Sequence, residues 1–160
     1  MVILGIDPGL ERVGWGCVQR EGSRLQALGY GLIQTPKIEL AQRLKLIYDE
    51  VCGLFETYQP TAIALERQIF AANKTTAFDV SKAVGVILLA SVDHHLTPSE
   101  YTPPEIKQAV VGVGNADKKQ VQFMVTKLLS LAVTPKPDDV ADALAIAICH
   151  AMRSRISVPQ

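Results

Sequence analysis

The amino terminus, residues 1–9, constrains the fold of this chain more than any other stretch. It reads Met-Val-Ile-Leu-Gly-Ile-Asp-Pro-Gly, an uncharged run that ends in an acid and a Pro-Gly turn. Residues 2–6 therefore predict a buried strand. Asp7 follows at its carboxyl end, where open α/β sheets place their ligands. A buried carboxylate there needs hydrogen bonds or a cation. A turn-capping aspartate is the alternative, and this stretch alone does not decide between the two.

Further segments extend the predicted sheet. Residues 13–19 and 24–33 alternate in polarity, and the Glu-Gly-Ser sequence at 21–23 is a hairpin turn signal. Apolar residues at helical spacing predict a helix over 39–58, and residues 61–65 predict a second short buried strand. A strand–helix–strand connection favours a parallel neighbour. We therefore expect three antiparallel strands, with a parallel fourth strand beside the first.

The second buried strand also ends in an acid, Glu66. Parallel pairing would bring Glu66 to the sheet edge that holds Asp7. Two carboxylates at adjacent strand ends repel each other unless they share a proton or a cation. Taken singly, Glu66 has a plainer explanation, an ion pair with Arg67 or another exposed base. The combination with Asp7 favours a site.

The second half of the chain is mostly helical in pattern. Residues 76–93 predict a helix, and its 83–92 portion is apolar almost all round, which is typical of a helix buried on more than one side. Since one sheet face covers only one side, a subunit interface is the expected cover for the other. A short strand at 99–102 completes a five-stranded mixed sheet flanked by helices. Two more helices are predicted over 105–111 and 117–129.

Three lysines occupy notable helix positions. Lys107 lies in the first of these two helices, and Lys118 and Lys119 begin the second. Bases at a helix start oppose the helix dipole. A solvated face explains them adequately, but a nearby phosphate would explain their placement better. The glycine spacing at 112–114 is not that of a phosphate-binding P-loop.

The last predicted helix begins with three acids. Asp139 and Asp142 are three residues apart, so both point from one face of the first turn. Asp138 lies on a different side and is the better N-cap candidate, although N-capping is also the alternative for Asp139. Asp142 is harder to explain structurally, because it opens a helix that is otherwise almost wholly apolar.

Composition limits the class of protein. The 160 residues amount to one domain, and 16 basic residues balance 16 acidic ones. No apolar run reaches membrane-spanning length, and the first residues lack a basic region typical of signal peptides. We therefore expect a soluble cytoplasmic protein with no membrane association. Three widely spaced cysteines predict reduced thiols rather than disulfides or zinc.

The acids together indicate a reaction class. Asp7, Glu66, Asp139 and Asp142 would bring four negative charges into one crevice, a density that suits hard divalent cations. Two magnesium ions about 4 Å apart can activate a water and stabilise the leaving oxygen in phosphodiester cleavage. No Ser/His/Asp or Cys/His set competes. The sequence therefore favours metal-dependent phosphoryl hydrolysis.

Four motifs resemble the RuvC Holliday-junction resolvases: ILGIDPG at the start, LERQIF in the middle, DVADALAIA near the end, and IKQAVVGVGNADKKQVQ at 106–122. The resemblance covers essentially the whole chain, residues 1–160, as a single nuclease domain. It implies a ribonuclease-H-like α/β fold, a homodimer, and symmetric nicking of four-way DNA junctions in recombination and repair. It also implies two Mg²⁺ ions per active site, with Mn²⁺ as a possible substitute. A branch-migration complex of the RuvA and RuvB type would be a partner.

The resemblance assigns roles residue by residue. The family's four acids fall on Asp7, Glu66, Asp139 and Asp142, and Asp139 stands at the most variable of the four positions. The basic DNA-contacting positions fall on Lys107 and Lys118. The aromatic that stacks on DNA falls on or next to Phe70; Ile69 departs from the aromatic that many members carry there.

Other functions share parts of this pattern. Actin-like ATP-binding modules often begin with a strand, an aspartate and a Gly-rich turn, but this chain is too short for two such domains. A ribonuclease-H-like nuclease acting on RNA would use the same acids, and the lysine-bearing segment 106–122 favours the junction reading instead. A DNA-binding scaffold without catalysis would not need all four acids.

Overall fold

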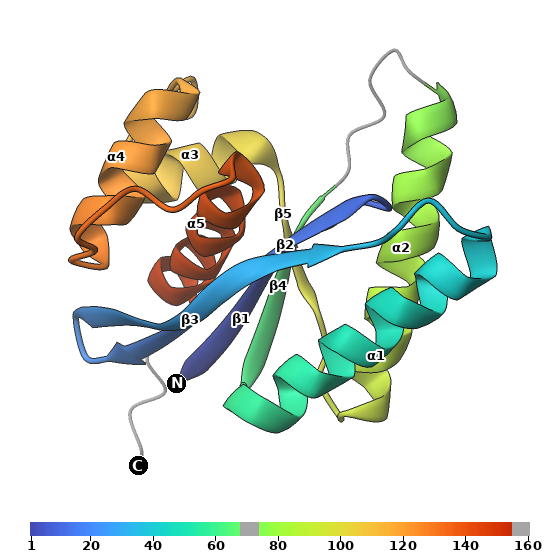
Figure 1. The fold of residues 1–160 in the computed structure, drawn as a ribbon. Coiled ribbons are helices and arrows are strands. Elements are labelled where there is room, and N and C mark those ends of the chain that lie inside the picture. The colour runs from blue at the N-terminus through green and yellow to red at the C-terminus, as the bar shows by residue number, and fades with distance from the viewer. Residues whose placement is uncertain (68–73, 155–160) are drawn as a thin grey trace.

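A computed structural model describes residues 1–67 and 74–154. A five-stranded sheet of order β3-β2-β1-β4-β5 lies between two groups of helices (Figure 1). The strands are β1 (Val2–Asp7), β2 (Arg12–Glu21), β3 (Arg24–Gln34), β4 (Ala62–Glu66) and β5 (Ser99–Tyr101). The helices are α1 (Leu40–Tyr58), α2 (Lys74–Asp93), α3 (Pro103–Val111), α4 (Lys118–Leu128) and α5 (Asp138–Arg153).

The strand pairing confirms the predicted sheet. β1 pairs antiparallel with β2 and parallel with β4, while β2 and β3 form the hairpin. β5 then pairs in parallel with β4. Two helix starts differ slightly from the prediction: α2 and α3 each begin two residues earlier than the apolar pattern indicated. The prolines at 103 and 104 fit the first turn of α3, where a missing N–H costs nothing.

The sheet separates two hydrophobic cores. One core joins α5, α3 and α4 to the sheet face that carries Ile3 and Ala64. The other joins α1 and α2 to the opposite face, which carries Leu4, Ile6 and Leu65. Successive strand residues point to opposite faces, and this alternation is why one apolar run serves both cores.

The expected N-cap role of Asp138 is wrong. Pro137 is the N-cap residue of α5, and Asp138 is already its first helical residue. The carboxylate of Asp138 instead accepts a hydrogen bond from Gln122 Nε2 of α4 at 2.9 Å. Asp138 therefore ties the start of α5 to α4.

Within the described residues, no helix combines the length and the apolar character needed to cross a membrane.

Candidate functional site

Side-chain alternation along β1 and β4 decides which face of the sheet receives their terminal acids. Ile3 of β1 and Ala64 of β4 both belong to the core on the α5 side. Asp7 and Glu66 lie four and two residues further on, so both point to that same side. The two strands pair in parallel as direct neighbours, so their carboxyl ends share one edge. The structure thus brings these two acids together, as their strand positions predicted.

Two glycines let α5 approach the sheet closely above this edge. A Cβ at Gly5 of β1 or at Gly14 of β2 would collide with the backbone of α5, in the second case with the carbonyl group of Asp139. Gly14 is also the partner of Asp7 across the β1–β2 ladder. The first turn and a half of α5, which carries Asp139 and Asp142, therefore lies directly over the Asp7 end of β1.

The electrostatics of Asp7 show that the other three acids lie near it. Burial is the largest cause that raises the pKa of Asp7, and the negative charges of Asp142, Glu66 and Asp139 add to it, so that the pKa reaches about 8. Lys118 acts in the opposite direction. An ionised carboxylate at this position therefore lacks sufficient positive charge around it.

The pKa values of two neighbouring acids, Glu66 and Asp142, are also raised. Burial raises the pKa of Glu66, the Asp142 charge adds to this, and Lys107 opposes it. Burial also raises the pKa of Asp142, and Lys118 opposes it. Acids that raise one another's pKa in a partly buried place are typical of functional sites.

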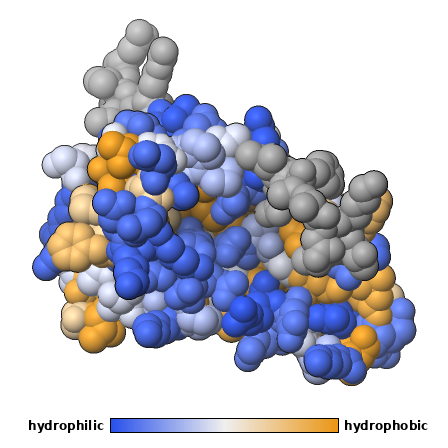
Figure 2. All heavy atoms as spheres, turned by 90° about the horizontal axis from the view of Figure 1, so that it is seen from above, coloured by the Kyte–Doolittle hydropathy of each residue, from blue (hydrophilic) through white to orange (hydrophobic). Residues whose placement is uncertain are grey.

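The two lysines predicted to contact DNA lie beside these acids. A cavity of about 230 Å³ is lined by Glu66, Asp142, Lys107 and Lys118, together with apolar residues of α3, α4 and α5. Figure 2 shows the molecule of Figure 1 from above, and the centre of the face seen there is mainly hydrophilic. Lys119 lines a different cavity on α4, next to Phe123. Only one of the two adjacent lysines therefore belongs to the site.

Basic side chains from other elements pair with the acids of α5. The Lys118 Nζ atom lies 3.1 Å from Asp138 Oδ2 and 3.4 Å from Asp142 Oδ2. The Arg12 Nε atom lies 3.6 Å from Asp139 Oδ2. Sequence reasoning missed both Arg12 and the pairing role of Asp138. The available signal was a lone arginine just after the turn that follows Asp7, which alone does not identify a partner.

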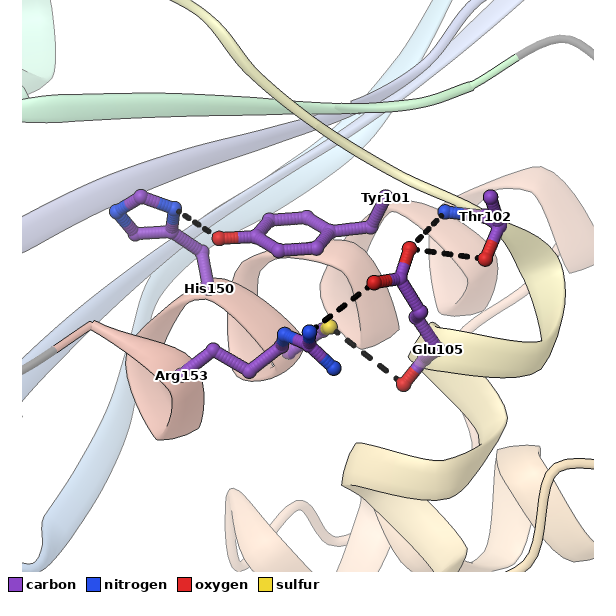
Figure 3. A network of polar contacts seen from close by, with 6 residues as sticks. Tyr101, Thr102, Glu105, His150 and Arg153 are labelled. Atoms are coloured by element: carbon purple, nitrogen blue, oxygen red, sulfur yellow. Dashed lines mark hydrogen bonds and ion pairs between the residues drawn. The ribbon is translucent and has the colours of Figure 1, made fainter.

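A polar network holds α3 in place (Figure 3). One carboxylate oxygen of Glu105 accepts hydrogen bonds from the backbone N–H and the hydroxyl of Thr102, both at 2.9 Å. The other oxygen accepts from Arg153 Nη2 at 3.0 Å. Glu105 therefore links the start of α3 to the end of α5. Lys107, two residues further along α3, gains a defined position beside the acids.

The residues present fit a divalent cation by their chemistry. Four carboxylates gather around one sheet edge, and oxygen ligands are those that magnesium prefers. The raised pKa of Asp7 reflects burial first and repulsion by the neighbouring acids second, and a bound cation would offset both. Among the described residues, however, no three His, Cys, Asp or Glu side chains close on one point as an ion would require. The structure therefore brings suitable ligand residues to one sheet edge, but their side chains do not converge on a common point.

The predicted stacking residue Phe70 and its neighbour Ile69 lie outside the described residues. Their roles stay predictions.

Comparisons with known proteins identify the family. Residues 3–150 match the family model described as crossover junction endodeoxyribonuclease RuvC. The RuvC protein of Alkaliphilus metalliredigens is 53% identical over 152 residues, which cover 94% of this chain and 93% of that protein. The RuvC protein of Heliobacterium modesticaldum is 52% identical over 152 residues, with 94% of each chain covered.

A solved structure is similar over nearly the whole fold. The structure of Thermus thermophilus RuvC in complex with a Holliday junction substrate has a TM-score of 0.90 and 34% sequence identity, and the match covers 95% of this chain and 93% of that one. Sequence, fold and the acidic edge point to one family: the chain belongs to the RuvC family of crossover junction endodeoxyribonucleases.

Proposed function

We propose that this protein resolves four-way DNA junctions by paired, symmetric nicks that require a divalent metal ion. The observation that carries the proposal is the meeting of four carboxylates at one sheet edge, beside a cavity that Lys107 and Lys118 line. The relative from Thermus thermophilus was solved in complex with a Holliday junction substrate, which supports the same substrate for this chain.

Asp7, Glu66, Asp139 and Asp142 are the proposed metal ligands. These carboxylates would hold magnesium, which would supply activation of a water molecule and charge neutralisation at the leaving oxygen. The chain's own contribution is to fix the acids: β1 and β4 present two of them from the sheet, and α5 presents the other two. Manganese, which also takes oxygen ligands, is an expected substitute.

Lys107 and Lys118 are the proposed contacts to the DNA backbone. Both line the cavity that also contains Glu66 and Asp142, so a phosphate bound by these lysines would lie beside the acids. Phosphate contacts orient a nucleic acid without reading its sequence. Phe70 is the proposed stacking residue for a base at the junction crossover.

A homodimer is the proposed assembly. The α2 side chains Phe78, Leu89 and Val92 are 65%, 57% and 64% exposed, although all three are apolar. A second copy of the chain over this face would cover them and would present two sites to a two-fold junction. A RuvA and RuvB type branch-migration partner and a cytoplasmic location are further expectations of the family resemblance.

The test uses a synthetic immobile four-way junction, a linear duplex of the same sequence and an RNA–DNA hybrid. We expect paired nicks in the junction with Mg²⁺, and no nicks in the junction without a metal or in the duplex. Cleavage of the hybrid alone would contradict the proposal and favour an RNA-directed nuclease.

A further inference from the structure

Two of the four acids already have a basic partner. Lys118 is shared between Asp142 and Asp138, and Arg12 pairs with Asp139. By contrast, Asp7 and Glu66 make no ion pair within 4.0 Å among the described residues. Among the described residues, the sheet acids thus lack a direct ion-pair partner, whereas the helix acids pair with residues of α4 and β2.

These ion pairs engage one carboxylate oxygen of each helix acid, and both acids are proposed metal ligands. Asp142 directs Oδ2 toward the ammonium of Lys118, and Asp139 directs Oδ2 toward the guanidinium of Arg12. A base beside such an oxygen competes with a metal ion for its negative charge. This is consistent with the finding that no three described acids close on one point.

We propose that Lys118 and Arg12 are built-in counter-cations of Asp142 and Asp139, which a divalent ion must displace and which the DNA backbone then takes over. The proposal rests on the proposed function and adds a coupling to it. A phosphate that draws Lys118 away from Asp142 frees a ligand for the metal. An ion that displaces Lys118 frees an ammonium for the phosphate.

The surroundings of Lys118 fit this exchange. Its side chain is 54% exposed, whereas that of Asp142 is 31% exposed, so the lysine can reach outward while the acid stays at the site. Asp138, which is 55% exposed and is bound by Gln122, gives the ammonium a second partner outside the four proposed ligands. Lys118 is therefore retained near the cavity even when it leaves Asp142.

Two consequences follow for binding. The base competes with the ion in the absence of DNA, so its removal should tighten metal binding rather than weaken it. Coupling between two ligands is also reciprocal, so junction DNA and the metal should each raise the affinity of the other by the same factor. A lysine that only contacts DNA would produce neither effect on the metal.

The first measurement uses the full chain and Mn²⁺ alone, with free Mn²⁺ followed by electron paramagnetic resonance at low salt. We expect Lys118→Ala to bind Mn²⁺ up to about fivefold more tightly than the wild type, the upper limit set by the modest strength of half-exposed ion pairs. Arg12→Ala should show a smaller change in the same direction, because its pair is longer. Lys119→Ala, on the same helix but outside the site, should bind like the wild type. Thermal melting checks that each variant is folded.

The second measurement follows junction binding by fluorescence anisotropy as Ca²⁺ is added, after a check that Ca²⁺ supports no nicking under these conditions. The wild type should bind the junction more tightly with Ca²⁺, and Lys118→Ala should lose most of that gain. A folded Lys118→Ala variant with unchanged or weaker Mn²⁺ affinity would overturn the proposal. The Mn²⁺ measurement contains no DNA, so it stands even if the junction proves not to be the substrate.

Discussion

Helices α5 and α2 are both rich in apolar residues and lie on opposite faces of the same sheet (Figure 1). α5 lies against β1 and β2 and is covered in turn by α3 and α4, so most of its residues are fully buried. α2 packs against α1, and its outer face leaves Phe78, Leu89 and Val92 exposed. The same apolar pattern therefore has two meanings, an enclosed core helix and a helix with an uncovered face.

The difference teaches where each function belongs. The buried packing of α5 places two acids over two strand ends, which suits chemistry that depends on fixed positions. The open face of α2 suits association, because exposed apolar area that gathers on one face marks an interaction surface. We expect changes on the α5 side to alter nicking or binding, and changes on the α2 side to alter assembly.

The largest effect should come from Asp7→Asn on the α5 side. The substitution keeps the shape of the side chain but removes one charge from the acidic set, so we expect about a thousandfold loss of nicking, or roughly 4 kcal/mol of barrier. Junction binding should persist.

Asp7→Asn should lower the nicking rate but raise the folding stability. The pKa of Asp7 is raised to about 8 in the folded state from an ordinary value of 3.8, so the folded state binds the proton more tightly than the unfolded one. Folding stability is therefore lost as pH rises through this window. At pH 8 without metal, the asparagine variant should melt at a higher temperature. For the nicking prediction, a rate of the Asp7→Asn variant close to that of the wild type would refute the proposed metal-binding role of Asp7.

The next prediction compares two glycine substitutions, one in β2 beneath α5 and one in α2. Gly14→Ala would push the new Cβ into the Asp139 carbonyl, and we expect a loss of about 1 to 3 kcal/mol in unfolding free energy, together with slower nicking. Gly85→Ala on α2 meets no atom within 4 Å, so it should gain about 0.5 to 1 kcal/mol from better helix propensity. Chemical denaturation of both variants measures this. Equal effects at the two sites would show that α5 is not tightly seated.

A smaller effect is expected for Leu89→Glu on α2. Its side chain is 57% exposed in the single chain, so the monomer should keep its melting behaviour. A charge at an interface would weaken dimerisation by about 1.5 to 3 kcal/mol, the value of a buried leucine side chain. Sedimentation velocity over a range of concentrations measures the change, with the exposed Gln26→Glu on β3, away from α2, as a control. A wild-type chain that stays monomeric at micromolar concentration and cuts junctions fully would contradict the proposed dimer.

The smallest energetic effect is expected for single lysines on the α5 side. Lys107→Ala should lower the slope of log affinity against log salt by about one, since each phosphate contact releases counterions. The loss should be similar for junctions of different base sequence. Lys119→Ala is the control, because Lys119 lines a cavity away from the acids. Identical slopes for wild type and Lys107→Ala would mean that Lys107 does not touch the backbone.

Sequence pattern predicted much of this fold because each local signal agreed with its neighbours. The strand ending in Asp7, the hairpin at 21–23 and the strand ending in Glu66 define the sheet order that the structure confirms. Asp138 is the counter-example. Its position suited an N-cap, but a contact with Gln122, sixteen residues away, draws its carboxylate to α4. Local propensity does not contain such a partner.

The sequence by itself determined which acids reach the site, since strand alternation and helical spacing place Asp7, Glu66, Asp139 and Asp142 by simple periodicity. Tertiary structure alone decided how near they come and which bases join them. Gly5 and Gly14 gain their meaning only when α5 lies on the sheet, where a Cβ would collide with its backbone. The Arg12–Asp139 and Lys118–Asp142 pairs join residues 127 and 24 positions apart (139 − 12 and 142 − 118). Contacts of that span depend on packing between elements, which no local pattern encodes.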